Sequence, residues 1–84
     1  MIYKINITRT AIKELSSIDR SKAIDIKDKI MTLKENPHPA GSKKLVGRDG
    51  WRLRYGDYTV IYEIEENEKS ILILHIGHRK DIYK

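Results

Sequence analysis

Two arginines alternate with large apolar residues in the stretch WRLRY, residues 51–55. Successive side chains of a strand point to opposite faces, so Arg52 and Arg54 are expected on one face and the three apolar residues on the other, toward the core. Like charges on one open face repel each other unless an anion lies across them, and guanidinium groups bind phosphate through paired hydrogen bonds. The pattern therefore predicts an anion-binding face. The alternative is that both arginines are ordinary solvated residues or pair with Glu63.

A second group of basic and aromatic residues follows in GHRKDIY, residues 77–83. Arg79 and Tyr83 supply what a phosphate and a stacked base require, namely a guanidinium and an aromatic ring. His78 is a candidate acid–base group, because imidazole exchanges protons near neutral pH, although a structural role at a strand end is the alternative. The spacing of the histidines indicates no metal site, and no cofactor motif is present.

The overall composition is that of a small basic domain. The 84 residues carry 17 Lys and Arg against 12 Asp and Glu, a formal charge of +5, which favours a polyanionic or acidic partner. The length predicts one domain spanning residues 1–84. The lack of cysteine excludes a disulfide framework, and the sequence has no apolar run long enough to span a membrane, so we expect a cytoplasmic protein with no membrane contact.

Hydrophobic periodicity predicts the elements that position these residues. Residues 2–7 alternate as a strand, and apolar positions then recur with helical spacing from Thr8 to about Ser17 and from Asp19 or Ser21 to Asn36. Residues 43–46 could form a short edge strand in a glycine-rich loop, and three strands follow at 51–55, 58–64 and 70–76. We predict an α+β fold in which a helical hairpin covers one face of a four-stranded sheet and leaves the other face open and basic. The sheet would comprise the N-terminal strand and a three-stranded antiparallel meander.

The whole chain resembles the RelE-like toxins of bacterial and archaeal toxin–antitoxin modules. The similarity is carried by KKLVGRDGWRLRYGDYTVIYEI, residues 43–64, and ILILHIGHRKDIY, residues 71–83. The resemblance implies a metal-independent, ribosome-dependent endoribonuclease that cuts mRNA in the A site through attack of the RNA's own 2′-OH and so inhibits translation. It also implies a cognate antitoxin, held in a hetero-oligomer, whose acidic segment occupies the basic groove.

The family's functional positions match four residues here. The resemblance assigns catalytic roles to Arg52, Arg54, Arg79 and Tyr83, with the guanidiniums stabilising the charge of the transition state and the tyrosine stacking on the base. Ribosomal RNA would be contacted by further basic residues of the second helix, the loop and the C-terminal segment. These are Lys27, Lys29, Lys34, Lys43, Lys44, Arg48 and Lys80.

Two departures from the family pattern leave alternatives open. The family commonly has an arginine directly after the G-D-Y tyrosine, where this chain has Thr59, so the toxin could be catalytically weakened. Arg52 is a poor proton acceptor, which leaves the general base unassigned. Two alternative functions remain. The chain could be a ParE-like toxin that poisons DNA gyrase without cleaving RNA, or an inactive binding module with an open sheet.

Overall fold

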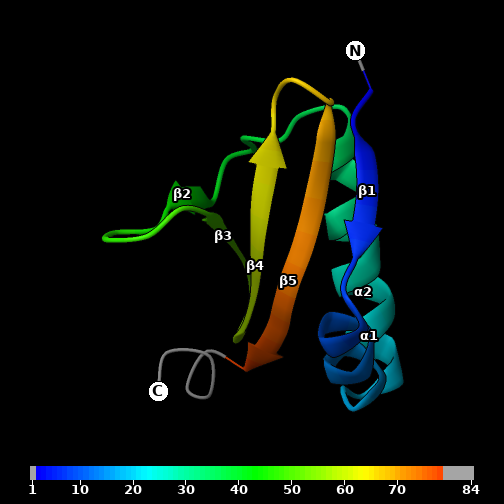
Figure 1. The fold of residues 1–84 in the computed structure, drawn as a ribbon. Coiled ribbons are helices and arrows are strands. Elements are labelled where there is room, and N and C mark those ends of the chain that lie inside the picture. Colours follow the sequence, from blue (N-terminus) through cyan, green and yellow to red (C-terminus); the bar gives the residue numbers. More distant parts are fainter. Residues whose placement is uncertain (1, 79–84) are drawn as a thin grey trace.

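The computed structural model describes residues 2–78. Its strands and helices follow the order predicted from the sequence (Figure 1). The elements are β1 (Lys4–Ile7), α1 (Arg9–Ser16), α2 (Arg20–Met31), the 3₁₀ helix η1 (Thr32–Lys34), β2 (Ser42–Lys44), β3 (Trp51–Tyr55), β4 (Tyr58–Glu65) and β5 (Ser70–His78). The predicted α+β class, helical hairpin and antiparallel meander are confirmed. No helix within residues 2–78 is both long and apolar enough to cross a membrane.

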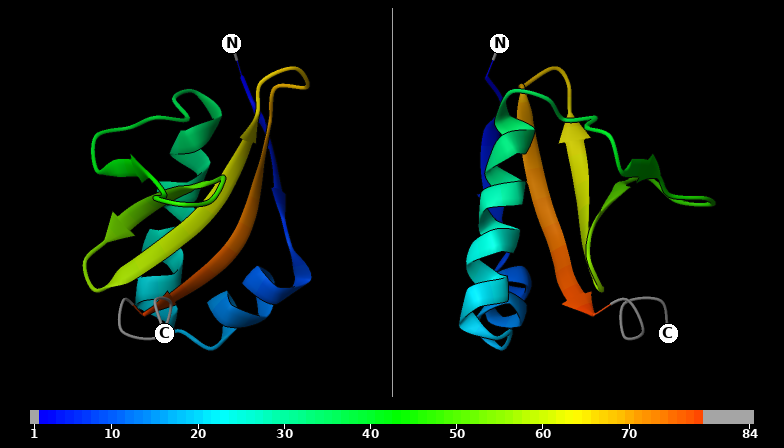
Figure 2. Two further views of the ribbon diagram at one scale, coloured as in Figure 1. Left: turned by 60° about the vertical axis from the view of Figure 1, so that its left-hand side comes forward. Right: turned by 180° about the vertical axis from the view of Figure 1, so that it is seen from behind.

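The sheet has one strand more than predicted. Its order over the described residues is β1-β5-β4-β3-β2, with β1 parallel to β5 and every other pair antiparallel. The prediction of four strands was wrong because residues 42–44 pair with residues 51–53 along the edge of β3, where Lys43 lies opposite Arg52. Figure 2 shows this β2–β3 arm projecting away from the two helices.

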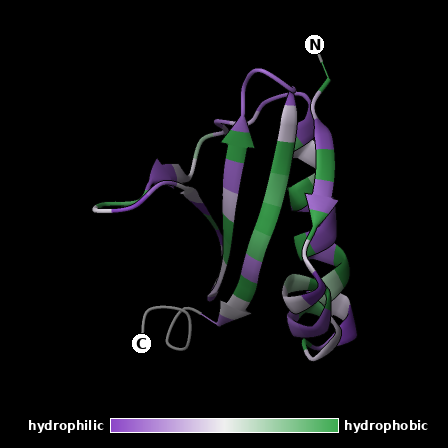
Figure 3. Cartoon of the chain, viewed as in Figure 1, coloured by the Kyte–Doolittle hydropathy of each residue, from purple (hydrophilic) through white to green (hydrophobic). Residues whose placement is uncertain are grey.

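The core lies between the helices and one face of the sheet. Thr8 caps α1 by accepting a hydrogen bond from the amide of Ala11 (3.1 Å), as its position predicted. The fully buried apolar side chains come from α1, α2, η1 and the three central strands, and the stripes of green in Figure 3 follow β4 and β5. They are Ala11, Ile26, Ile30, Leu33, Leu53, Val60, Tyr62, Ile71, Ile73 and Ile76.

A β-bulge in β5 changes what lies beside this strand. Ile61 pairs with His75 and Tyr62 pairs with Ile73, so Leu74 has no direct partner on β4. On the other side, β1 ends at Ile7 and α1 takes its place, with the Thr8 hydroxyl donating to the Leu74 carbonyl (3.1 Å). The N-cap of α1 thus contacts the backbone of β5 at the bulged residue, where pairing with β1 has stopped.

Candidate functional site

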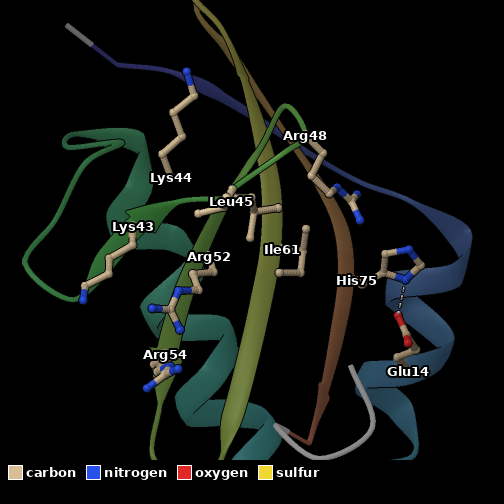
Figure 4. A pocket seen from close by; sticks show the side chains of 10 residues that line it. Glu14, Lys43, Lys44, Leu45, Arg48, Arg52, Arg54, Ile61 and His75 are labelled. Carbon is tan, nitrogen blue, oxygen red and sulfur yellow. Dashed lines mark hydrogen bonds and ion pairs between the residues drawn. The ribbon is translucent and has the colours of Figure 1, made fainter. Parts of the chain in front are cut away.

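The face of the sheet opposite the helices forms a groove of about 700 Å³ beneath the β2–β3 arm, shown from close by in Figure 4. Its walls come from β2, the following loop, β3, β4, β5 and one side chain of α1. Within residues 2–78, the lining residues are Glu14, Lys43, Lys44, Leu45, Val46, Arg48, Arg52, Arg54, Ile61 and His75. Five of these ten carry a positive charge and one carries a negative charge, so the groove suits an anionic ligand.

Arg52 and Arg54 lie on the open face that strand alternation predicts, since Leu53 between them is fully buried on the other face. Lys43 lies opposite Arg52 on the neighbouring strand, so a row of three cations crosses β2 and β3. Among residues 2–78, neither arginine lies within ion-pair distance of a carboxylate, and the predicted alternative of pairing with Glu63 is not observed. The row therefore has its charge available for a ligand.

The loop between β2 and β3 lines the groove, and a backbone hydrogen bond joins its two ends. The Leu45 amide donates to the Gly50 carbonyl at 3.0 Å. Gly50 has φ of +126°, and a Cβ there would stand 3.1 Å from Leu45 Cδ1. Glycine is favoured here because other residues rarely adopt this positive φ, and a Cβ would also crowd Leu45. Beyond it, Val46 and Arg48 are exposed at the tip of the arm, which leaves the tip residues in reach of a partner.

A carboxylate and an imidazole meet on the side of the groove opposite Arg52 and Arg54 (Figure 4). Glu14 Oε1 accepts the amide of Ile76 at 3.1 Å and lies 3.4 Å from His75 Nδ1. Sequence analysis named neither residue as a candidate site residue. The two residues are 61 positions apart, and no local spacing connects them.

The other predicted site residues lie elsewhere. His78 is opposite Tyr58, its ring meeting the tyrosine ring edge-on with centroids 5.7 Å apart, and strand alternation puts it on the same face as the buried Ile76. The three lysines of the helical region lie on α2 and η1, away from the groove; they are Lys27, Lys29 and Lys34. The predictions for Arg79, Lys80 and Tyr83 fall outside the described residues.

Tyrosine hydroxyls connect the site-bearing strands to the helical side of the molecule. The Tyr55 hydroxyl donates to Asp25 Oδ2 at 2.8 Å, which raises the pKa of Tyr55 and links β3 to α2. Tyr62 on β4 is fully buried, and this burial raises its pKa, while its hydroxyl donates to the Pro37 carbonyl at 2.9 Å. These contacts connect β3 to α2 and β4 to the segment that follows η1.

Comparison with known proteins identifies the family. The model of the ParE toxin of type II toxin–antitoxin systems matches residues 5–83. The chain belongs to this toxin family. The toxin is 30% identical to the toxin RelE of Mycobacterium tuberculosis over 84 residues, which cover 98% of this chain and 87% of that one.

Solved structures share the toxin's fold. The archaeal RelE–RelB complex from Pyrococcus horikoshii matches with a TM-score of 0.84 and 30% identity, over 96% of this chain and 99% of that one. The RelB–RelE antitoxin–toxin complex from Methanococcus jannaschii matches with a TM-score of 0.71 and 26% identity, over 92% and 93% of the two chains. The resemblance to RelE-like toxins expected from residues 43–64 and 71–83 is confirmed.

Proposed function

We propose that this toxin is a ribosome-dependent endoribonuclease that cuts mRNA and so stops translation. The observation that carries the proposal is the row formed by Lys43, Arg52 and Arg54 on an open groove, without a carboxylate partner for either arginine among the described residues. Guanidinium groups held by a sheet can contact the non-bridging oxygens of a phosphate and stabilise the negative charge that grows during cleavage.

The chemistry is a transesterification within the RNA. The 2′-oxygen attacks the neighbouring phosphorus, the bond between phosphorus and the 5′-oxygen breaks, and a 2′,3′-cyclic phosphate and a 5′-hydroxyl remain. Arg52 and Arg54 bind the phosphate, and Arg79 and Tyr83 keep the transition-state and base-stacking roles that the family resemblance implies. The basic residues of the arm, together with Lys27 and Lys29 of α2 and Lys34 of η1, contact ribosomal RNA backbone.

The proposed partner in the resting cell is a cognate antitoxin. The two similar structures from Pyrococcus horikoshii and Methanococcus jannaschii are complexes of a toxin with its antitoxin, which supports such a partner here. We expect an acidic segment of the antitoxin to cover the groove, because that segment would neutralise the same cations that bind RNA.

A gyrase-poisoning function is the second candidate, and Thr59 favours it. This residue stands where RelE-like toxins commonly have an arginine, and its side chain is fully buried. A toxin acting only through docking would need no transition-state donor at this position.

Primer extension on a defined mRNA, bound to purified programmed ribosomes, tests the proposal. Wild-type protein should produce A-site cuts, and Arg54→Ala and Arg79→Ala should reduce them on the order of 10²-fold. Lys22→Ala, an exposed lysine on α2 outside the groove, is the matched control and should cut like the wild type. Absence of cuts with the wild type, together with inhibited DNA supercoiling by gyrase, would replace the nuclease by the second candidate.

A further inference from the structure

We propose that His75, positioned by Glu14, is the proton-transfer residue of the groove, taking the proton from the attacking 2′-OH. The proposal deepens the proposed nuclease function and rests on it. It supplies the base that the family-matched residues lack, since the guanidiniums of Arg52 and Arg54 stay protonated.

The position of His75 satisfies the first requirement for such a residue, which is access to the ligand. His75 pairs with Ile61 across the sheet, on the open face, and both side chains line the groove together with Arg52 and Arg54. Its side chain is 47% exposed, so the ring is reachable from the groove without any rearrangement of the core.

Glu14 satisfies the second requirement, which is a fixed orientation of the imidazole. Its Oε1 is held by the Ile76 amide at 3.1 Å and stands 3.4 Å from His75 Nδ1. An ionised carboxylate only accepts hydrogen bonds, so this contact favours the tautomer with hydrogen on Nδ1. The lone pair is then on Nε2, the ring nitrogen that can accept a proton from the RNA.

The β-bulge brings the pair together. Because Leu74 has no direct partner on β4, the register of β5 shifts, and His75 emerges on the open face. The Ile76 amide then has no strand beside it on the outer edge, since β1 has ended at Ile7, and it donates to Glu14 of α1 instead. The bulge thus exposes the histidine, and the end of β1 leaves the Ile76 amide that anchors its carboxylate.

The other histidines within residues 2–78 are less suited to this role. His38 lies against the ring of Trp51, with centroids 4.4 Å apart, and lines no part of the groove. Strand alternation puts His78 on the face that carries the buried Ile76 and Val60. Of these three histidines, only His75 shares the groove with the arginines.

The proposed step balances as follows. His75 Nε2 takes the 2′-hydroxyl proton while the bond between the 2′-oxygen and phosphorus forms. The bond from phosphorus to the 5′-oxygen breaks, and a water molecule gives that oxygen its proton. The imidazolium then returns its proton to the hydroxide that remains, so water and neutral His75 are restored.

Single-turnover cleavage on programmed ribosomes, measured from about pH 5 to about pH 9, tests the role in catalysis. The wild-type rate should rise with pH and level off, because only neutral imidazole accepts a proton. His75→Gln should lower the plateau on the order of 10²-fold and remove the rise. His38→Gln is the matched control and should keep both. In the part of the chain that the structure describes, the charged groups that line the groove with His75 are Glu14 of α1, the two lysines of β2, Arg48 of the loop and the two arginines of β3.

A His75→Gln protein that keeps the wild-type rate and pH rise would overturn the inference while leaving the nuclease intact. If the rise disappears in His78→Gln instead, the base is His78. Absence of cleavage by the wild type at every pH would overturn the proposed function and this role with it.

Nitrogen NMR of the histidine rings in the free protein gives a readout that does not depend on activity. We expect His75 in the Nδ1–H form. Glu14→Gln should weaken that preference, because a carboxamide can either accept from the ring or donate to it. A wild-type His75 that carries its hydrogen on Nε2 would contradict the positioning by Glu14.

Discussion

Arg54 and Thr59 lie directly opposite each other on β3 and β4, yet one side chain is exposed and the other is fully buried. Thr59 Oγ1 has no hydrogen-bond partner within residues 2–78. In the sequence, Thr59 stands where RelE-like toxins commonly have an arginine, so a positively charged hydrogen-bond donor is missing beside Arg52 and Arg54. Its burial adds a second consequence, since a desolvated hydroxyl without a partner costs folding free energy.

Replacing this hydroxyl should therefore stabilise the protein. Thr59→Val keeps the branched shape and removes the unpaired oxygen, and we expect the free energy of unfolding to rise by about 1 kcal/mol. Urea denaturation of the two proteins measures the difference. A clear decrease would mean that the hydroxyl has a partner in solution.

Arg54 should contribute one mRNA phosphate contact when the toxin binds ribosomes programmed with mRNA. Each neutralised phosphate releases counterions, so Arg54→Ala should reduce the slope of log affinity against log salt concentration by about 1. Binding to ribosomes at several salt concentrations gives the slope. Lys22→Ala changes the net charge equally from outside the groove, and an equal change in slope for that variant would attribute the effect to overall charge.

The hydroxyl of Tyr62 should contribute measurably to stability. It is buried and donates to the Pro37 carbonyl at 2.9 Å, which ties β4 to the segment after η1. Tyr62→Phe keeps the ring and should lower the free energy of unfolding by about 1 kcal/mol, since the carbonyl loses its donor. Thermal and urea unfolding would measure this, and an unchanged stability would show that water replaces the donor.

The contact between Tyr3 and Glu66 should make stability depend on pH in acid. The Tyr3 hydroxyl donates to Glu66 Oε2 at 2.8 Å, and this hydrogen bond holds the pKa of Glu66 below its ordinary value. The contribution is then present above the unfolded pKa, about 4.3, and is lost as the pH falls through the lower folded pKa. Unfolding curves of wild type and Tyr3→Phe should differ at neutral pH and converge in strong acid; a constant gap would contradict the linkage.

Much of the fold could be predicted because its signals are local. The Thr8 cap and the apolar stripe of α2 depend on residues within a few positions of one another, and the structure keeps both. The strand of residues 42–44 was predicted only loosely, since three residues rich in lysine carry little periodic signal. Its existence depends on backbone pairing with β3, which is a tertiary contact.

The sequence by itself determined which side chains of WRLRY face the core and which face outward, because alternation is a property of the extended backbone. It also determined the family resemblance. Only the tertiary structure decided that β1 lies parallel to β5 and ends at Ile7, that β5 has a bulge at Leu74, and that Glu14 meets His75 in the groove that the arginines line. Side-chain direction is set within a few residues, whereas neighbours in space are set by which strands pair and where the pairing stops.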